Sequence, residues 1–232
     1  MVAIDRNGWS RSSECAHEGE LNSLLRPYDR IYKPSEQGQF PLILSFHGCS
    51  GPSIEQEKAW ASILNSEGYA LVAVDSFKGR NANPQSVCQG NTLWGNERAS
   101  DVYVSINHFM SQPWVNKSSI SLMGFSHGAW SILDALAQPP GRLPDGLSGS
   151  DPNIINNVKF AIVFYPYCNF PAKHRNGWDR DTQILAVLAG ADQVVSTAAC
   201  QKIFDDQKSK RGFNTPVHRD LGASEGVKNL LR

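Results

Sequence analysis

Short apolar segments alternate with predicted helices along most of the chain. The apolar segments have the length of strands buried on both faces, and they cover residues 41–47, 70–75, 120–125, 158–165 and 184–189. Helices are predicted between them, many with apolar residues at helical spacing, over residues 53–68, 97–110, 129–136 and 197–208. This alternation predicts an α/β fold with a mostly parallel, doubly wound sheet flanked by helices.

Several stretches depart from this alternation. Residues 1–27 are polar and lack clear periodicity, which predicts an irregular or loosely docked N-terminal arm. Residues 28–33 alternate as an edge strand would. Two long loops, 76–97 and 139–157, are of a length that is often functional or mobile in compact domains. Since 232 residues suit one α/β domain, we predict a single domain over residues 28–232 after the arm.

A candidate nucleophile lies where the apolar strand at 120–125 passes into a helix. The sequence there is Gly124-Phe125-Ser126-His127-Gly128. Glycines on both sides of Ser126 let strand and helix approach closely while the serine occupies a strained turn with its hydroxyl exposed. The alternative is a glycine-bounded turn with a capping serine. The strand before and the helix after favour the nucleophile.

A serine nucleophile also needs two hydrogen-bond donors for the oxyanion of its intermediate. The first donor is the backbone N–H of His127, which follows the nucleophile at the helix start. The second should come from the loop after an earlier strand. His47-Gly48-Cys49 has the expected form, so we assign this donor to the N–H of Cys49. The alternative for His47-Gly48 is a plain strand end with a turn glycine.

The acid and the base are predicted from their order along the chain. With a serine nucleophile on a strand–turn–helix motif, the acid and then the histidine are expected to follow it along the chain. Asp192 comes after the 184–189 strand and is the candidate acid, although it can also cap the next helix. His218 is the one histidine after Asp192 and is therefore the candidate base, with a solvated surface histidine as the alternative. Asp75 precedes the nucleophile, so we predict a structural role for it.

Composition narrows the function further. Lys plus Arg equals Asp plus Glu at 22 each, so no net field recruits nucleic acid or an anionic membrane. No apolar segment approaches the ~20 residues of a membrane span, and the N-terminus lacks the apolar core of a signal peptide. We therefore expect a soluble, cytoplasmic protein as given, with no membrane or nucleic-acid partner. The sequence carries no prediction of oligomeric state.

The five cysteines show no C-x-x-C spacing, which disfavours zinc. They are either buried free thiols of a cytosolic protein, or two disulfides and a spare thiol of an exported one. Neither a P-loop nor a dinucleotide-binding glycine pattern is present in the sequence. We therefore predict no cofactor and no metal.

Five motifs in order resemble the dienelactone hydrolase family of α/β-hydrolases. They are the segments 41–51, 74–77 with Arg80 and Cys88, 124–128, 164–168 and 190–196 with Cys200. The resemblance implies Ser126 as nucleophile, Asp192 as acid, an oxyanion hole from Cys49 and His127, and hydrolysis of a small-molecule ester or lactone. It also implies disulfides Cys49–Cys88 and Cys168–Cys200, as in exported members, which would make the protein periplasmic or secreted.

The C-terminal segment departs from the family. The family's base lies just past a final strand, in a segment resembling Tyr-Pro-Gly-x-x-His-x-Phe, whereas residues 214–221 place His218 where that strand should begin. One interpretation is that the last strand and the catalytic-histidine loop are missing. Two hypotheses follow: a serine ester hydrolase acting through an acyl-enzyme, and a catalytically impaired α/β-hydrolase scaffold that binds a ligand or partner. Acyl transfer to an alcohol would use the same residues as hydrolysis.

Overall fold

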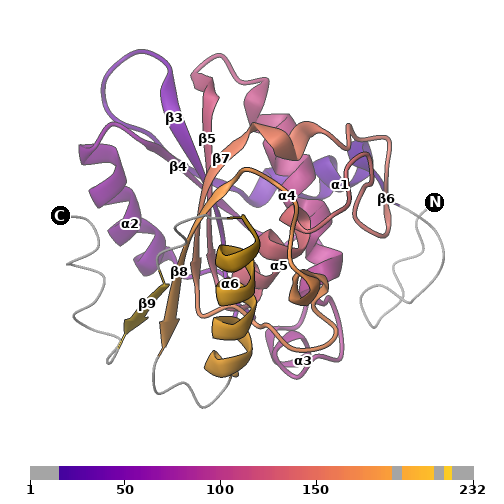
Figure 1. Cartoon of the computed structure of the whole chain (residues 1–232). Helices are drawn as coiled ribbons and strands as arrows, with labels where there is room; N and C mark the ends of the chain where they lie inside the picture. The colour runs from indigo at the N-terminus through magenta and orange to yellow at the C-terminus, as the bar shows by residue number, and fades with distance from the viewer. Residues whose placement is uncertain (1–15, 190–194, 212–216, 221–232) are drawn as a thin grey trace.

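The computed structural model describes residues 16–189, 195–211 and 217–220. A seven-stranded sheet crosses the middle of the molecule, with helices on both faces (Figure 1). Its order is β2-β4-β3-β5-β7-β8-β9, and all neighbours are parallel except the edge pair of β2 and β4. The predicted mostly parallel α/β sheet is therefore confirmed.

The predicted strands occur close to their expected positions. The sheet strands are β2 (Arg30–Tyr32), β3 (Phe40–Phe46), β4 (Ala70–Val74), β5 (Val115–Phe125), β7 (Val158–Phe164), β8 (Gln183–Ala189) and β9 (Val217–Asp220). Strands β3 and β4 and the 120–125 part of β5 are largely apolar and buried because helices cover both sides of the sheet. Strand β2 pairs on one side only, as expected of an edge strand.

The interpretation that the last strand is missing is wrong. Residues Val217–Asp220 form β9, which pairs in parallel with β8. The register places Val217 opposite Ala186 and Asp220 opposite Ala189. A β-branched valine at the start of this short segment suits a strand, and the exposed edge of β8 offers it a ladder of backbone partners.

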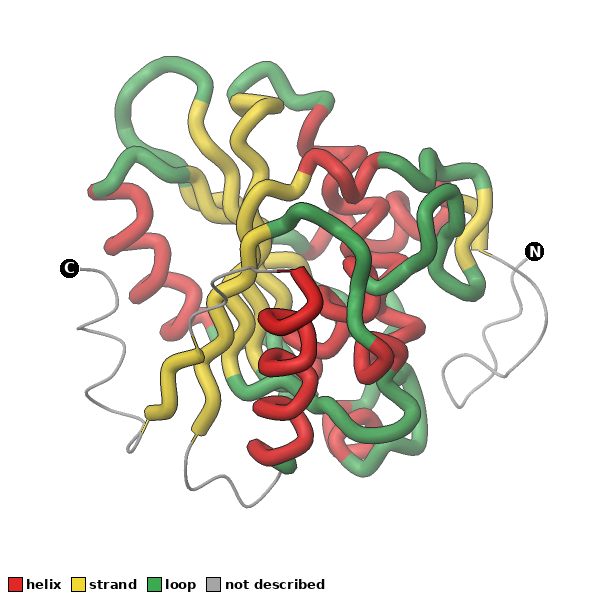
Figure 2. Tube along the Cα trace, in the orientation of Figure 1, coloured by secondary structure: helices red, strands yellow, loops and turns green. Residues whose placement is uncertain are grey.

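The helices divide between the two faces of the sheet, as Figure 2 also shows. Helix α2 (Ile54–Ser66) covers one face, where Trp60 and Leu64 pack into a cluster with Phe125 and Phe164. The other face carries α5 (His127–Leu136), with α4 (Gly95–Met110) packed on α5 and α6 (Thr197–Arg211) beside β8. This second face forms the main core and includes the aliphatic residues of α5, from Ala129 to Leu136.

The prediction of an irregular, loosely docked arm over 1–27 is wrong for its described part. Strand β1 (Ala16–His17) leads into α1 (Glu18–Leu25) and the 3₁₀ turn η1 (Arg26–Tyr28). Leu21 and Leu25 are buried, and α1 packs on α4. Leu21, Leu24 and Leu25 have helical spacing, and His17 and Glu20 form a capping box at the N-terminus. The stripe holds only three leucines among mostly polar residues, so the segment as a whole has the polar composition of an irregular arm.

Both long loops contain short elements. The loop 76–97 holds α3 (Pro84–Cys88), and the loop 139–157 holds β6 (Leu147–Ser148), which pairs with β1, and the 3₁₀ turn η2 (Ile154–Asn157). A third 3₁₀ turn, η3 (Lys173–Asn176), lies between β7 and β8. Two disulfides, Cys49–Cys88 and Cys168–Cys200, are formed, so the free-thiol alternative is wrong for these four cysteines.

The described residues hold neither a candidate membrane span nor a candidate metal site. None of the helices among them has the length and apolar character needed to cross a membrane. Within the same ranges, no group of three or more His, Cys, Asp or Glu side chains is arranged to hold a metal ion.

Candidate active site

Ser126 lies in a strained turn between β5 and α5. Its backbone has φ of +49° and ψ of −110°, a conformation that non-glycine residues rarely adopt. The turn is anchored on both sides: the Ser126 N–H donates to the carbonyl of Phe164 at 2.8 Å, and the Ser126 carbonyl accepts from the Trp130 N–H at 2.9 Å. Pairing to the neighbouring strand and to the first turn of α5 therefore holds the serine in place.

The two glycines that flank Ser126 are required by contact. A Cβ at Gly124 would lie 2.7 Å from the Ala129 nitrogen, and a Cβ at Gly128 would lie 2.1 Å from the Phe46 carbonyl oxygen. Neither glycine has a positive φ, so each is needed for close approach of α5 to β5 and to the end of β3. The geometry matches the predicted strand, sharp turn and helix.

The loop after β3 lies against the nucleophile. A Cβ placed on Gly48 would be 3.7 Å from the Ser126 Cβ and 3.6 Å from the Phe125 carbonyl oxygen. The loop turns back on itself through a hydrogen bond from the Gly51 N–H to the Gly48 carbonyl at 3.2 Å. The Cys49–Cys88 disulfide joins this loop to α3. The structure therefore brings Ser126, His127 and the Gly48-Cys49 segment together.

The histidines of the predicted oxyanion segments have buried, structural side chains. His47 Nδ1 donates to the Gly48 carbonyl at 2.7 Å, and its Nε2 accepts from the Ser76 N–H at 3.3 Å. His127 Nδ1 accepts from Arg98 Nη1 at 2.9 Å, since a guanidinium cannot accept. Burial, and next the charge of Arg98, holds the pKa of each imidazole well below 6.5. Both rings are therefore neutral at pH 7, and neither is free to serve as the base.

These two depressed pKa values predict that the protein loses stability in mild acid. In the unfolded chain each histidine takes up a proton below about pH 6.5, whereas in the folded chain it does not. Stability is therefore complete above pH 6.5 and falls as the pH falls. We expect each histidine to contribute a loss of about 1 kcal/mol between pH 7.5 and 5.5.

Urea denaturation at the two pH values measures this loss. The variant His47→Asn should have a smaller difference between pH 7.5 and 5.5 than the parent. An unchanged difference in His47→Asn would show that His47 is not held neutral.

Arg98 is a site residue that the sequence analysis missed. It lies in α4 with a fully buried side chain, and its Nη1 contacts both the His47 carbonyl, at 3.0 Å, and His127 Nδ1. The sequence did hold a sign of its burial. Arg98 comes four residues before Val102 and eight before Ile106, so it lies on the apolar face of the predicted helix. A cation on such a face indicates a buried polar contact.

The structure tests the predicted role of Asp75 but not that of Asp192. Asp192 lies outside the described residues, so its role stays a prediction. Asp75 has a structural role, as predicted: its Oδ1 accepts from the backbone N–H groups of Phe77 and Lys78 at 3.0 and 2.8 Å, which closes the turn after β4.

The backbone register places His218 away from β5. His218 pairs with Val187, which pairs with Phe164, which in turn pairs with Phe125, the residue before the nucleophile. Three strand spacings of ~4.8 Å separate the outer members of this row, or about 14 Å. The sheet by itself therefore does not bring His218 to Ser126, and its role as base stays a prediction.

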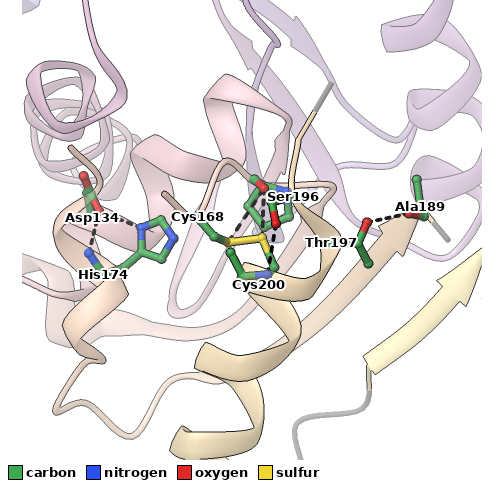
Figure 3. Close-up of a disulfide and its surroundings, with 9 residues drawn as sticks. Asp134, Cys168, His174, Ala189, Ser196, Thr197 and Cys200 are labelled. Carbon is green, nitrogen blue, oxygen red and sulfur yellow. Dashed lines mark hydrogen bonds and ion pairs between the residues drawn. A yellow bond between two sulfur atoms is a disulfide. The ribbon is translucent and has the colours of Figure 1, made fainter. Parts of the chain in front are cut away.

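A buried Asp–His pair connects α5 to the loop after β7. The Asp134 carboxylate accepts from the backbone N–H and Nδ1 of His174 at 2.8 and 2.6 Å (Figure 3). It also accepts from the Trp130 indole N–H at 2.7 Å. The Trp130 ring lies 4.9 Å from that of Tyr167 and 5.3 Å from that of His127. The sequence analysis did not predict this pair. A single carboxylate within the otherwise apolar predicted helix 129–136 indicated that Asp134 is buried and needs a partner.

The second disulfide fixes the start of α6. Cys168 follows β7, and Cys200 lies in the first turn of α6 (Figure 3). The Thr197 hydroxyl donates to the Ala189 carbonyl at the end of β8, at 2.7 Å. The two sides of the loop that carries Asp192 are therefore joined to each other and to the loop after β7.

Solved structures with the same fold include several esterases. No model of a known protein family and no curated protein matches the chain. A dienelactone hydrolase assigned in Klebsiella pneumoniae superposes with a TM-score of 0.65 at 12% identity, covering 88% of this chain and 83% of its own. Esterase Est2 of Thermogutta terrifontis with bound propionate gives 0.61 at 16% identity, covering 88% and 85%. Acetyl xylan esterase 1 of Thermoanaerobacterium gives 0.56 at 16%, covering 87% and 76%.

These comparisons confirm the α/β-hydrolase fold. The chain shares the sheet and helix arrangement of dienelactone hydrolase-like and esterase structures. At such low sequence identity the comparison shows the fold alone. Any inference about the chemistry must therefore come from the geometry around Ser126.

Proposed function

We propose that this protein is a serine carboxylic-ester or lactone hydrolase that acts through an acyl-enzyme. The observation that carries the proposal is the strained conformation of Ser126, with φ of +49°, directly beside the Gly48-Cys49 loop. A turn of this kind costs of order 1–3 kcal/mol and persists only where the surrounding structure imposes it. Here it places a half-buried serine at the start of a helix, where free N–H groups stabilise negative charge.

In the proposed reaction, Ser126 Oγ attacks the carbonyl carbon of the ester and His218 accepts the hydroxyl proton. Asp192 orients the histidine and stabilises its charged form. The N–H groups of Cys49 and His127 donate to the oxyanion of the tetrahedral intermediate. The intermediate expels the alcohol, which takes the proton from His218, and leaves an acyl group on Ser126. Water then attacks the acyl carbon and releases the acid and the free serine. No cofactor or metal enters these steps.

The substrate class follows by analogy with a structural neighbour. Est2 binds propionate and butyrate and is phosphonylated by sarin. By analogy, we propose small esters with short acyl groups as substrates of this chain, and phosphonates as covalent probes of Ser126. An alcohol in place of water would make the same acyl-enzyme a transferase, and the ratio of acid to new ester measured with added alcohol separates the two.

The register of β9 favours a second candidate function. His218 lies within a strand that is three positions from β5. If no histidine reaches Ser126, the chain keeps the fold and the oxyanion hole but lacks a base, and it then binds a small ligand or a partner without turnover. Removing the base from a complete triad costs on the order of 10⁶ in kcat, so the two functions differ by a measurable amount.

Hydrolysis of p-nitrophenyl acetate, propionate and butyrate by the full chain tests both functions. Under the hydrolase proposal the parent turns over, and His218→Ala loses on the order of 10⁴-fold or more in kcat. His108→Ala, in α4, is the matched control and should retain the parent's kcat.

Each contrary outcome has one meaning in this assay. Turnover that is unchanged in His218→Ala would remove His218 from the mechanism. A parent that neither turns over nor is labelled at Ser126 by a fluorophosphonate would reject the hydrolase in favour of the binding scaffold.

A further inference from the structure

Two separate segments must stay in register for an oxyanion hole to work here. One is the start of α5, which carries the His127 N–H, and the other is the loop after β3, which carries the Cys49 N–H. Gly128 leaves room for α5 to lie close to the carbonyls of Phe46 and His47. The pairing of β3 with β5 extends as far as Phe46 opposite Gly124, so beyond that row side-chain contacts can set the spacing of the two donors.

A single nitrogen atom of Arg98 makes this connection. Its Nη1 carries two N–H groups and lies 3.0 Å from the His47 carbonyl oxygen and 2.9 Å from His127 Nδ1. The His47 carbonyl belongs to the peptide just before the Gly48-Cys49 peptide, and the His127 imidazole belongs to the residue that supplies the other donor. Arg98 therefore contacts both donor-bearing segments.

Arg98 also brings a positive charge to this position. The side chain is fully buried, and desolvation lowers its pKa to about 10, which still leaves it protonated at neutral pH. It makes no hydrogen bond to a carboxylate within the described ranges. Asp101, one turn further along α4, is paired with Arg80 at 2.5 and 3.0 Å. The Asp101 carboxylate is thus bound by another arginine, and the Arg98 hydrogen bonds go to the two donor-bearing segments.

Fold stability alone gives a poor reason for this arrangement. The Nε and Nη2 atoms of Arg98 are buried without a hydrogen-bond partner among the residues that the structure describes, which is a costly state for a cation. The Phe77 ring, 5.4 Å from the guanidinium carbon, offers a cation–π contact. An apolar side chain in the same space would avoid the unpaired nitrogens.

We propose that Arg98 is a positioning residue of the oxyanion hole, fixing the Cys49 and His127 amides relative to each other and adding positive potential close to them. The proposal rests on the proposed hydrolase function, because an oxyanion hole has a task only where an acyl group is transferred. Arg98 acts through the two segments and does not touch the substrate.

Three variants test this role. Arg98→Met removes the charge and both hydrogen bonds at similar length, and Arg98→Lys keeps a cation without the fork. Arg180→Met is the matched control, because Arg180 is also a buried arginine that donates to main-chain carbonyls, those of Leu136 and Gln138, but at the far end of α5. Each variant is compared with the parent in kcat and KM on p-nitrophenyl butyrate and in Tm.

The proposal predicts a loss in kcat without a matching change in KM. We expect Arg98→Met to lose on the order of 10²-fold in kcat, as when one oxyanion donor is removed, with KM within about threefold. Arg98→Lys should recover about tenfold of this loss through its charge. Arg180→Met should lower Tm but keep kcat within about threefold. A kcat retained in Arg98→Met, or lost equally in Arg180→Met, would overturn the proposal.

Crystal structures of the variants give a readout that needs no turnover. In Arg98→Met we expect the Gly48-Cys49 segment to move by about 1 Å relative to Ser126, a displacement large enough to impair catalysis, and in Arg180→Met we expect no movement there. An unmoved segment would reject the role of Arg98 even in an active enzyme. If the parent shows no turnover, the hydrolase proposal fails and this comparison still decides the positioning role. Should Arg98→Met not fold, Arg98→Lys undergoes both measurements.

Discussion

Replacing Ser126 by alanine is expected to remove ester hydrolysis almost completely. The hydroxyl is the atom that forms the acyl-enzyme in the proposed reaction, and loss of a triad serine costs on the order of 10⁶ in kcat. The fold should survive, because the turn is held by the Ser126 backbone bonds to Phe164 and Trp130, which alanine retains. Initial rates on p-nitrophenyl propionate, with Tm measured in parallel, check the expectation.

A serine elsewhere on the same strand provides the control. Ser121 lies in β5, five residues before the nucleophile, and Ser121→Ala should keep the parent's rate. Labelling by a fluorophosphonate should disappear in Ser126→Ala and persist in Ser121→Ala. Turnover that remains in Ser126→Ala after contaminating esterases are removed would rule out Ser126 as the nucleophile.

Gly128→Ala should be strongly destabilising. Its new Cβ would lie 2.1 Å from the Phe46 carbonyl oxygen and 2.7 Å from that of His47. Both are backbone atoms of the central strand and its end, so relief requires α5 to move away from β3. We expect a loss of about 3 kcal/mol or more in the free energy of unfolding, at the upper end of overpacking effects.

The control for this substitution is another glycine in the first turn of a helix. At Gly19 in α1 a Cβ would lie 3.6 Å from His17 Nδ1, which is an ordinary contact. Gly19→Ala should therefore be neutral or stabilising by up to about 1 kcal/mol, because alanine is the better helix former. Urea denaturation of the two variants measures the contrast. Equal effects at the two positions would show that the contact at Gly128 is not limiting.

Local patterns in the sequence determined much of this protein. The length and apolar character of 41–47, 70–75 and 120–125 predicted buried parallel strands, since only residues covered on both faces are apolar without alternation. The glycine spacing around Ser126 predicted the strained turn, because both the steric need and the residues that meet it lie within five positions. Chain order was enough to predict that Asp75 is structural.

Contacts between distant segments could be decided only by the tertiary structure. Arg98 meets His47 and His127 across separations of 51 and 29 residues, and Asp134 meets His174 across 40, so no local pattern specifies either partner. The docking of α1 depended on a hydrophobic stripe too short to stand out from its polar surroundings. Strand β9 formed because the edge of β8 supplied backbone hydrogen-bond partners, which a sequence of four residues does not reveal. The local sequence determines where helices and strands form, through steric and hydrophobic preferences of neighbouring residues. Which polar side chains become hydrogen-bond partners is decided by the tertiary structure, because a polar group that is buried on folding needs a partner.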